Sequence, residues 1–371
     1  MIEKIKLIKQ LFFQSPFKAY TLIIVSIISI FLEGFSYATI LPLLENYLGS
    51  SEGSNLSEMI EYVFNYVGFT TNIISISIIF VILIVLKNFF RIFREYLTAN
   101  YKYYLREIWL KKTYKAMDNT DYEKIISINR GKLFNNVFHE TNNATLGMEN
   151  LIEIFTTIVS IVIFVIILLL TSIKFTLLIA STAALILLLN RILLYNYSRK
   201  IGNKEVELNQ LVSSVIHDSL VSIKNIKSFN VMSDFSKYLN GHVRYLRKIM
   251  VQWRVYTFST MPIIETFLVL VIITFVIYWN VYNNNVETLV PLLAVIVVVG
   301  QRLMQQLSRL LIAINSFNRM KRSFNIISEL INFDKANKII NSESKKDNII
   351  LDIIKQDIEF NNISFNYEKS K

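Results

Sequence analysis

Six long apolar runs constrain the fold of this chain more than any other feature. A helix rises 1.5 Å per residue, so about 20 residues cross a hydrocarbon core roughly 30 Å thick. We place the runs at residues 19–44, 72–90, 151–173, 175–195, 262–282 and 286–314. A soluble helical protein can bury one or two such segments. Six of them, with a mean hydropathy of +0.42, predict an all-α, six-span polytopic membrane protein, and membrane lipid as its first partner.

The charges of the connections predict how the protein is oriented. The connection at 43–71 carries acidic residues and no Lys or Arg, whereas the connection at 91–150 is rich in both. Basic residues accumulate on the cytoplasmic side of membranes, so both termini are expected to be cytoplasmic. The net charge of +11 is spread along membrane-adjacent segments and is not gathered with aromatics into one patch, so nucleic acid is not an expected partner.

Metal and disulfide chemistry find little support in the composition. The chain has no cysteine, and its histidines, His139, His217 and His242, are far apart in sequence. No metal site is expected. Residues 1–18 are predicted to form an interfacial elbow helix on the inner leaflet, with basic side chains near anionic headgroups.

The two long connections carry a helical pattern. Apolar and aromatic residues recur every three to four positions through 91–115, as in Phe93, Leu97 and Tyr101, and again through 208–216 and 246–253. Two helices of about 25 residues would extend on the order of 35 to 40 Å beyond the bilayer. The turns fall near 118–124 and 219–227. They either contact a partner or are solvated bends.

Three short segments carry a resemblance to a known family. They are RGKLFNNV at 130–137, followed by an acidic residue and a threonine, SLVSIKNIKSF at 219–229, and IEFNNISFNY at 358–367. The last segment alternates like a short pair of strands. Together with the six runs, these segments resemble the transmembrane domain of an ATP-binding-cassette (ABC) exporter and the first residues of its nucleotide-binding domain.

The resemblance implies a division of the chain into parts. Residues 19–335 would form the exporter transmembrane domain, residues 336–356 a linker, and residues 357–371 the first strands of a nucleotide-binding domain that this chain does not complete. Tyr367 would stack on adenine. The turns would couple the membrane domain to the ABC ATPase domain through Asp121, Tyr122, Ser222, Ile223 and Lys224.

The sequence contains no glycine-rich phosphate loop G-x-x-x-x-G-K-[ST], so no ATP-hydrolysing residue and no catalytic residue is predicted in it. ATP and Mg are expected to be bound mainly by the rest of the nucleotide-binding domain. Once completed by that domain, the protein would be an ABC-type ATP-driven translocase.

Charged residues inside the apolar runs are the candidate substrate site. Glu33 lies in the first run, and Arg302 and Arg309 lie seven residues apart in the sixth, about two turns along one helix face. A positive stripe facing a cavity attracts phosphate. The alternative is snorkelling to the interface or pairing with Glu33 or Glu265, and it is the favoured interpretation for Arg309. Lys87, Arg91 and Arg191 lie near span ends and are interpreted as interfacial anchors.

The outer connection at 56–69 places its apolar residues on one helix face. It is predicted to lie flat on the outer leaflet, where it either engages lipid or only packs on the spans. With the segments around Glu33 and Arg302, it is similar to bacterial flippases of lipid-linked oligosaccharides. That likeness implies an external helix at the lipid tail and basic cavity residues at the pyrophosphate, in a bacterial inner membrane.

We therefore expect the transmembrane half of a homodimeric ABC exporter or flippase. It would move an amphipathic, anionic, lipid-linked substrate by alternating access, together with a second copy of itself and an ABC ATPase domain. A multidrug or peptide ABC exporter is one alternative. A non-transporting membrane scaffold that docks a soluble partner is another.

Overall fold

The computed structural model describes residues 14–40, 42–43, 55–68, 72–118, 128–171, 173–193, 195–282, 289–344 and 362. Most of the predicted elbow helix lies outside these residues, as do Asp121 and Tyr122. The predicted strands at the end of the chain, with Tyr367, also lie outside them.

Within the described residues the chain is helical and has no strands. Its helices are α2 (Pro16–Ala38), α4 (Asn55–Val67), α5 (Ile73–Asp118), α7 (Arg130–Phe134), the π-helical η1 (Asn135–Glu140), α8 (Thr141–Thr171), α9 (Ile173–Leu193), α10 (Tyr195–Val221), α11 (Ile223–Ser228), α12 (Met232–Tyr282) and α13 (Leu289–Ser344). The all-α class predicted from the apolar runs is therefore confirmed.

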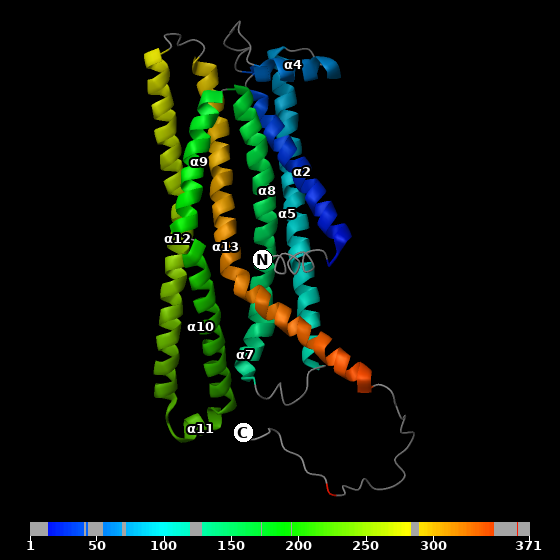
Figure 1. Cartoon of the computed structure of the whole chain (residues 1–371), viewed down its shortest axis with the longest axis vertical. Coiled ribbons are helices and arrows are strands. Elements are labelled where there is room, and N and C mark those ends of the chain that lie inside the picture. Colours follow the sequence, from blue (N-terminus) through cyan, green and yellow to red (C-terminus); the bar gives the residue numbers. More distant parts are fainter. Residues whose placement is uncertain are drawn as a thin grey trace.

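Several helices are much longer than a membrane is thick. Helices α5, α12 and α13 have 46, 51 and 56 residues, against the roughly 20 that cross a bilayer. Helices α10 and α12 form a long hairpin whose turn carries the short helix α11 (Figure 1). The helical pattern in the polar connections thus correctly predicted helices that continue beyond the apolar runs.

Four helical segments in the described part are long and apolar enough to cross a membrane: Pro16–Ala38, Ile73–Asp118, Arg130–Thr171 and Met232–Thr274. A fifth arises if Ile179–Ile192 and Asn196–Val221, which meet at 40°, form one span. The sixth predicted run belongs to α13, which is not among these segments. Six spans remain a prediction.

Helix α13 holds the bundle together. It packs on α8, α10, α12 and α5, while α2 packs on α5 and α8. In Figure 1, α13 runs between α8 and the helices α9 and α12, and its last part crosses α8 and α5. One apolar cluster, which includes Phe164 and Leu303, joins the predicted spans, and a second surrounds Trp109 and Phe324. Because α13 contributes residues to both clusters, a displacement of α13 in one cluster would be transmitted to the other.

Helix α4 agrees closely with the segment predicted at 56–69. Its Ile60 and Phe64 are buried in the apolar cluster of the spans, whereas Tyr62 and Tyr66 are 73% and 85% exposed. Figure 1 shows α4 lying across the bundle at the end opposite α11. One face of α4 is thus anchored on the spans and the other presents aromatic side chains outward.

A glycine allows α10 to approach α13 closely. A methyl group added at Gly202 would overlap the backbone of Arg319, including its carbonyl oxygen. Because backbone atoms have no alternative rotamer, the helices themselves would have to separate. Gly241, on α12, has nothing within 4 Å of such a methyl group.

We expect Gly202→Ala to lower the free energy of unfolding by about 1 to 3 kcal/mol, because it overpacks this contact. Gly241→Ala should leave stability unchanged or raise it by up to about 1 kcal/mol, through the higher helix propensity of alanine. Thermal unfolding of the two variants in the same detergent measures the difference. Equal melting temperatures for both would contradict the close packing of α10 on α13.

Candidate functional site: a basic cavity between the helices

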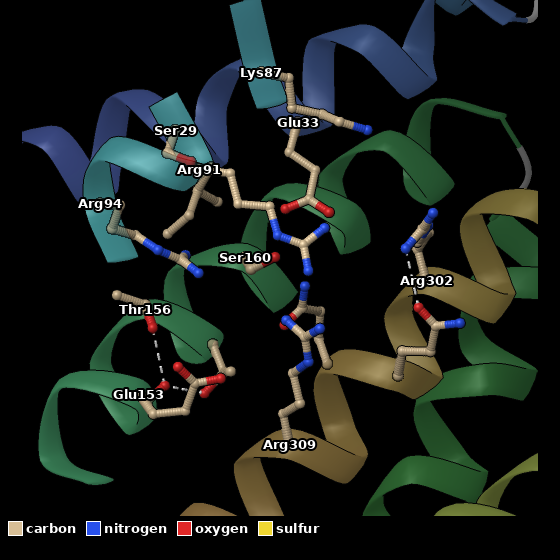
Figure 2. Close-up of a pocket in the computed structure, with 14 residues that line it drawn as sticks. Ser29, Glu33, Lys87, Arg91, Arg94, Glu153, Thr156, Ser160, Arg302 and Arg309 are labelled. Carbon is tan, nitrogen blue, oxygen red and sulfur yellow. Dashed lines mark hydrogen bonds between the residues drawn. The ribbon is translucent and has the colours of Figure 1, made fainter. Parts of the chain in front are cut away.

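A polar cavity lies between α2, α5, α8 and α13 (Figure 2). Its empty volume is about 500 Å³, including the space that opens to solvent. The residues that line it are Ser29, Ile30, Glu33, Lys87, Arg91, Arg94, Glu153, Thr156, Thr157, Ser160, Arg302, Gln305, Gln306 and Arg309. Nearly all of them are charged or polar, although the helices that carry them are largely apolar.

The cavity has an excess of positive charge. Five basic side chains line it against two acidic ones, Glu33 and Glu153. Among the described residues, no carboxylate lies within the 4.0 Å of an ion pair from any of the five basic groups. The predicted alternative, in which Arg302 or Arg309 is neutralised by an ion pair with Glu33, is therefore absent from this structure.

The arginines converge on the cavity from two helices. Figure 2 shows the guanidinium groups of Arg91 and Arg309 pointing toward one another, with the Glu33 carboxylate beside Arg91. The Nη1 of Arg302 donates a hydrogen bond to Gln305 Oε1 at 3.1 Å. Each guanidinium retains donors that are free to bind an anion, because arginine has five N–H groups.

Helix α8 supplies a row of polar side chains. Glu153, Thr156, Thr157 and Ser160 are spaced three to four residues apart and so share one face. The hydroxyls of Thr156 and Thr157 donate to the backbone carbonyl of Glu153 at 3.1 and 2.6 Å. The buried Ser160 Oγ has no hydrogen-bond partner. It is a polar atom available to a ligand in the cavity.

The structure brings together the three residues predicted for the substrate cavity, Glu33, Arg302 and Arg309. Lys87 and Arg91, which were predicted as interfacial anchors, also line the cavity. Position along the chain gives the depth of a residue in a span, but not the direction in which its helix faces. The row of polar side chains on α8 was not predicted, although polar residues at helical spacing within an apolar run can be recognised in the sequence.

The residues predicted for coupling at the second turn lie at the tip of the α10–α12 hairpin. Ser222 is the N-cap of α11, and Ile223 and Lys224 begin that helix. Lys224 is exposed, while Ile226 is 3% exposed and anchors the turn. The end of the molecule farthest from α4 thus presents a short helix to its surroundings (Figure 1).

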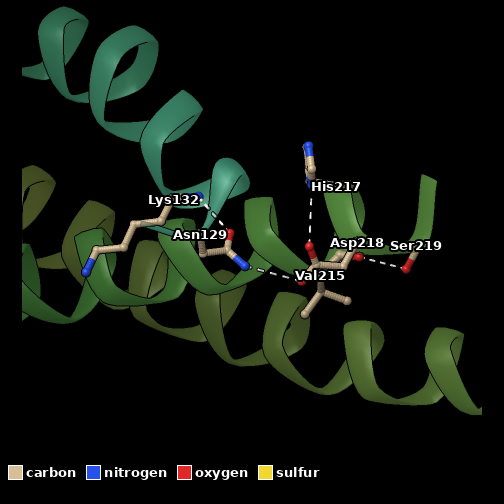
Figure 3. Close-up of polar contacts among 6 residues, drawn as sticks. All are labelled: Asn129, Lys132, Val215, His217, Asp218 and Ser219. Carbon is tan, nitrogen blue, oxygen red and sulfur yellow. Dashed lines mark hydrogen bonds and ion pairs between the residues drawn. The ribbon is translucent and has the colours of Figure 1, made fainter. Parts of the chain in front are cut away.

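The start of α7 is tied to this hairpin (Figure 3). Asn129 caps α7 by accepting from the backbone N–H of Lys132 at 3.2 Å. The Nδ2 of Asn129 donates to Asp218 Oδ2, near the end of α10, at 3.4 Å. The chain leaving the first predicted turn is therefore joined to the helix that enters the second.

Buried polar groups join η1, α10 and α13 closer to the predicted membrane. Glu140 is fully buried, and its carboxylate accepts from Asn135 Nδ2 at 3.1 Å and from Ser323 Oγ at 2.6 Å. Nearby, Arg319 Nη1 on α13 pairs with Glu205 Oε2 on α10 at 3.4 Å. These contacts give α10 and α13 a specific register.

Burial raises the pKa of Glu205 above its ordinary value of 4.5; Arg319 opposes this shift, and Glu140 adds to it. A raised pKa means that the folded state binds the proton more tightly than the unfolded state. The stability contributed by Glu205 is then largest at low pH and falls as pH rises through the raised pKa.

Glu205→Gln, which resembles the protonated side chain, should therefore gain melting temperature relative to the wild type as pH rises from 4.5 toward neutrality. Thermal unfolding in detergent across that range measures the difference. Glu207→Gln, at an exposed position on the same helix, is the contrasting control: Lys204 donates to this carboxylate at 2.9 Å and lowers its pKa, so this variant should not gain melting temperature relative to the wild type over the same range. A difference between Glu205→Gln and wild type that does not change with pH would contradict the assignment.

In the described part of the chain, no group of three or more His, Cys, Asp or Glu residues could hold a metal ion. A protein-family model described as ABC transporter transmembrane region matches residues 20–303. No curated protein matches the chain.

Proposed function

Since this chain belongs to the ABC transporter transmembrane family, we propose that it is the membrane half of an ATP-driven exporter of the flippase type. Proteins of this family act in the lipid membrane together with an ATPase. The proposed substrate is an amphipathic, anionic, lipid-linked molecule that bears phosphate. The basic cavity is the observation that supports this choice most strongly.

The cavity favours an anion on physical grounds. Charges inside a bundle of apolar helices are costly unless they are paired or solvated. Here the basic groups outnumber the acidic ones by three and lack contact ion pairs within the described residues. Arginine binds phosphate through two parallel N–H bonds, and Lys87 would add a point charge. A phosphate-bearing headgroup would therefore offset the cost of these charges.

The outer helix supports an amphipathic substrate. The exposed tyrosines of α4 form an aromatic surface beside the predicted spans. Aromatic side chains with a polar tip suit the boundary between lipid and water. We propose that the headgroup crosses through the cavity while the apolar tail stays in the bilayer and meets this surface of α4.

The long helices support alternating access. The tip at α11 would contact the ATPase domain through Ser222, Ile223 and Lys224, with Asp121 and Tyr122 doing so at the first turn. ATP and Mg would be bound by that domain, with Tyr367 stacking on adenine. Because Asn129 and Asp218 join the two turns, a push on either tip would move both. Helices α5, α8 and α13 would carry the movement to the cavity.

A second copy of the chain would enclose the transport pathway, giving a homodimer in a bacterial inner membrane with cytoplasmic termini. An exporter of apolar drugs would require an apolar cavity, whereas this cavity is lined by charged and hydroxyl side chains.

The proposal is tested by ATPase activation in the transporter assembled with its ATPase domain, in phosphatidylcholine liposomes. Geranylgeranyl diphosphate is the probe. Arg302→Ala should raise the half-activating concentration about tenfold or more, because it removes a charge-assisted contact worth about 1.5 to 3 kcal/mol. Glu33→Gln should lower that concentration, since it removes a negative charge from the cavity.

Arg191→Ala is the matched control, because it removes the same charge from an exposed position on α9 outside the cavity. Its half-activating concentration should equal that of the wild type. Activation that is insensitive to Arg302→Ala, or that Glu33→Gln weakens, would refute an anion site in this cavity.

A further inference from the structure

Tyr37 lies directly behind the basic cavity. It is near the end of α2, is only 9% exposed, and belongs to the apolar cluster of the predicted spans. Its ring centroid is 6.0 Å from that of Phe164 on α8. Tyr37 is not among the residues that line the cavity. Its ring is therefore fixed by packing, and it would affect a ligand in the cavity only indirectly, through the lining residues that it contacts.

Two of the cavity cations contact this one ring. Lys87 Nζ, from α5, lies 4.6 Å from the ring centroid and donates to the Tyr37 hydroxyl at 3.3 Å. The guanidinium carbon of Arg302, from α13, lies 4.9 Å from the same centroid. Figure 2 shows Lys87 and Arg302 reaching the cavity from different helices.

The ring contacts counteract the repulsion between the positive charges of Lys87 and Arg302. Long basic side chains have many rotamers, and two like charges in a bundle of low dielectric would turn apart. The negative face of an aromatic ring attracts a cation within about 6 Å. With no carboxylate in ion-pair range of either group among the described residues, the Tyr37 ring is the main partner that restrains both.

We propose that Tyr37 is a positioning residue of the anion site, whose ring holds the Lys87 ammonium and the Arg302 guanidinium ready for one diphosphate headgroup. Pre-organised groups bind more tightly because their side-chain freedom is lost before the ligand arrives. A diphosphate has two phosphoryl groups that can contact both cations, whereas a monophosphate has one. Tyr37 thus contributes to selectivity between these headgroups. The inference rests on the proposed function and names the headgroup it favours.

The test replaces Tyr37 without changing its volume much. Phenylalanine and its mono-, di- and trifluorinated analogues are placed at position 37 of the transporter assembled with its ATPase domain in phosphatidylcholine liposomes. Fluorine progressively withdraws the negative charge from the ring face but preserves the packing on Phe164. ATPase activation is measured with geranylgeranyl diphosphate, with geranylgeranyl monophosphate and with the uncharged geranylgeraniol.

The half-activating concentration of the diphosphate should rise stepwise with fluorination, by about five- to tenfold over the series, as expected for partly desolvated cation–π contacts. The half-activating concentration of the monophosphate should rise less over the same series. The ATPase rate at saturating diphosphate should change less than the half-activating concentration, because the ring acts on binding. In the Lys87→Met, Arg302→Met background the series should be flat, since Tyr37 then has no cation to position.

A flat series in the otherwise wild-type protein would overturn the role of Tyr37. Equal shifts for all probes, or a fall in the saturated rate as large as the shift in half-activating concentration, would identify a structural role and would also overturn it. If the wild type responds to geranylgeraniol as strongly as to the diphosphate, the proposed substrate class fails, and this inference fails with it. A wild type that prefers the diphosphate, combined with a flat series, leaves the proposed function intact and refutes only the role of Tyr37.

Discussion

The cost of holding positive charge between apolar helices governs the rest of this structure. Five basic groups point into one cavity whose walls belong to α2, α5, α8 and α13. Such a site persists only if the helices around it are held firmly, because mutual repulsion would otherwise open the bundle. The apolar cluster around Phe164 and Leu303, and the tyrosine shared by Lys87 and Arg302, provide that restraint.

The same helices connect the cavity to the opposite end of the molecule. Helix α13 carries Arg302 and Arg309 into the cavity and, further along, pairs with α10 through Arg319 and Glu205. Ser323 on α13 also donates to the buried Glu140, the last residue of η1, directly before α8. Charge in the cavity and the position of the α10–α12 hairpin are thus linked through one continuous helix. Such a link is what a transporter requires for its ATPase to drive movement at a distant site.

The sequence predicted the helices well because hydropathy and helical spacing are local properties. Helix α4 begins one residue before the predicted segment, and the long polar connections are helical as expected. The common face of Arg302 and Arg309 also followed from their spacing. The cavity as a whole could not be predicted from the sequence. The rotation of α5 turns Lys87 and Arg91 inward, and this rotation depends on packing against α2 and α8. Tyr37 was missed for the same reason: its contacts join α2 to three other helices, α5, α8 and α13, that are distant in sequence.

The central claim is that an anionic headgroup crosses the membrane through this cavity when ATP is hydrolysed. The most direct measurement uses labelled geranylgeranyl diphosphate in phosphatidylcholine proteoliposomes, with a membrane-impermeant phosphatase outside. Adding ATP should increase the fraction of diphosphate protected from the phosphatase in the wild type, and should not do so in Arg302→Ala. Protection that is independent of ATP, or unchanged by the loss of Arg302, would contradict the account.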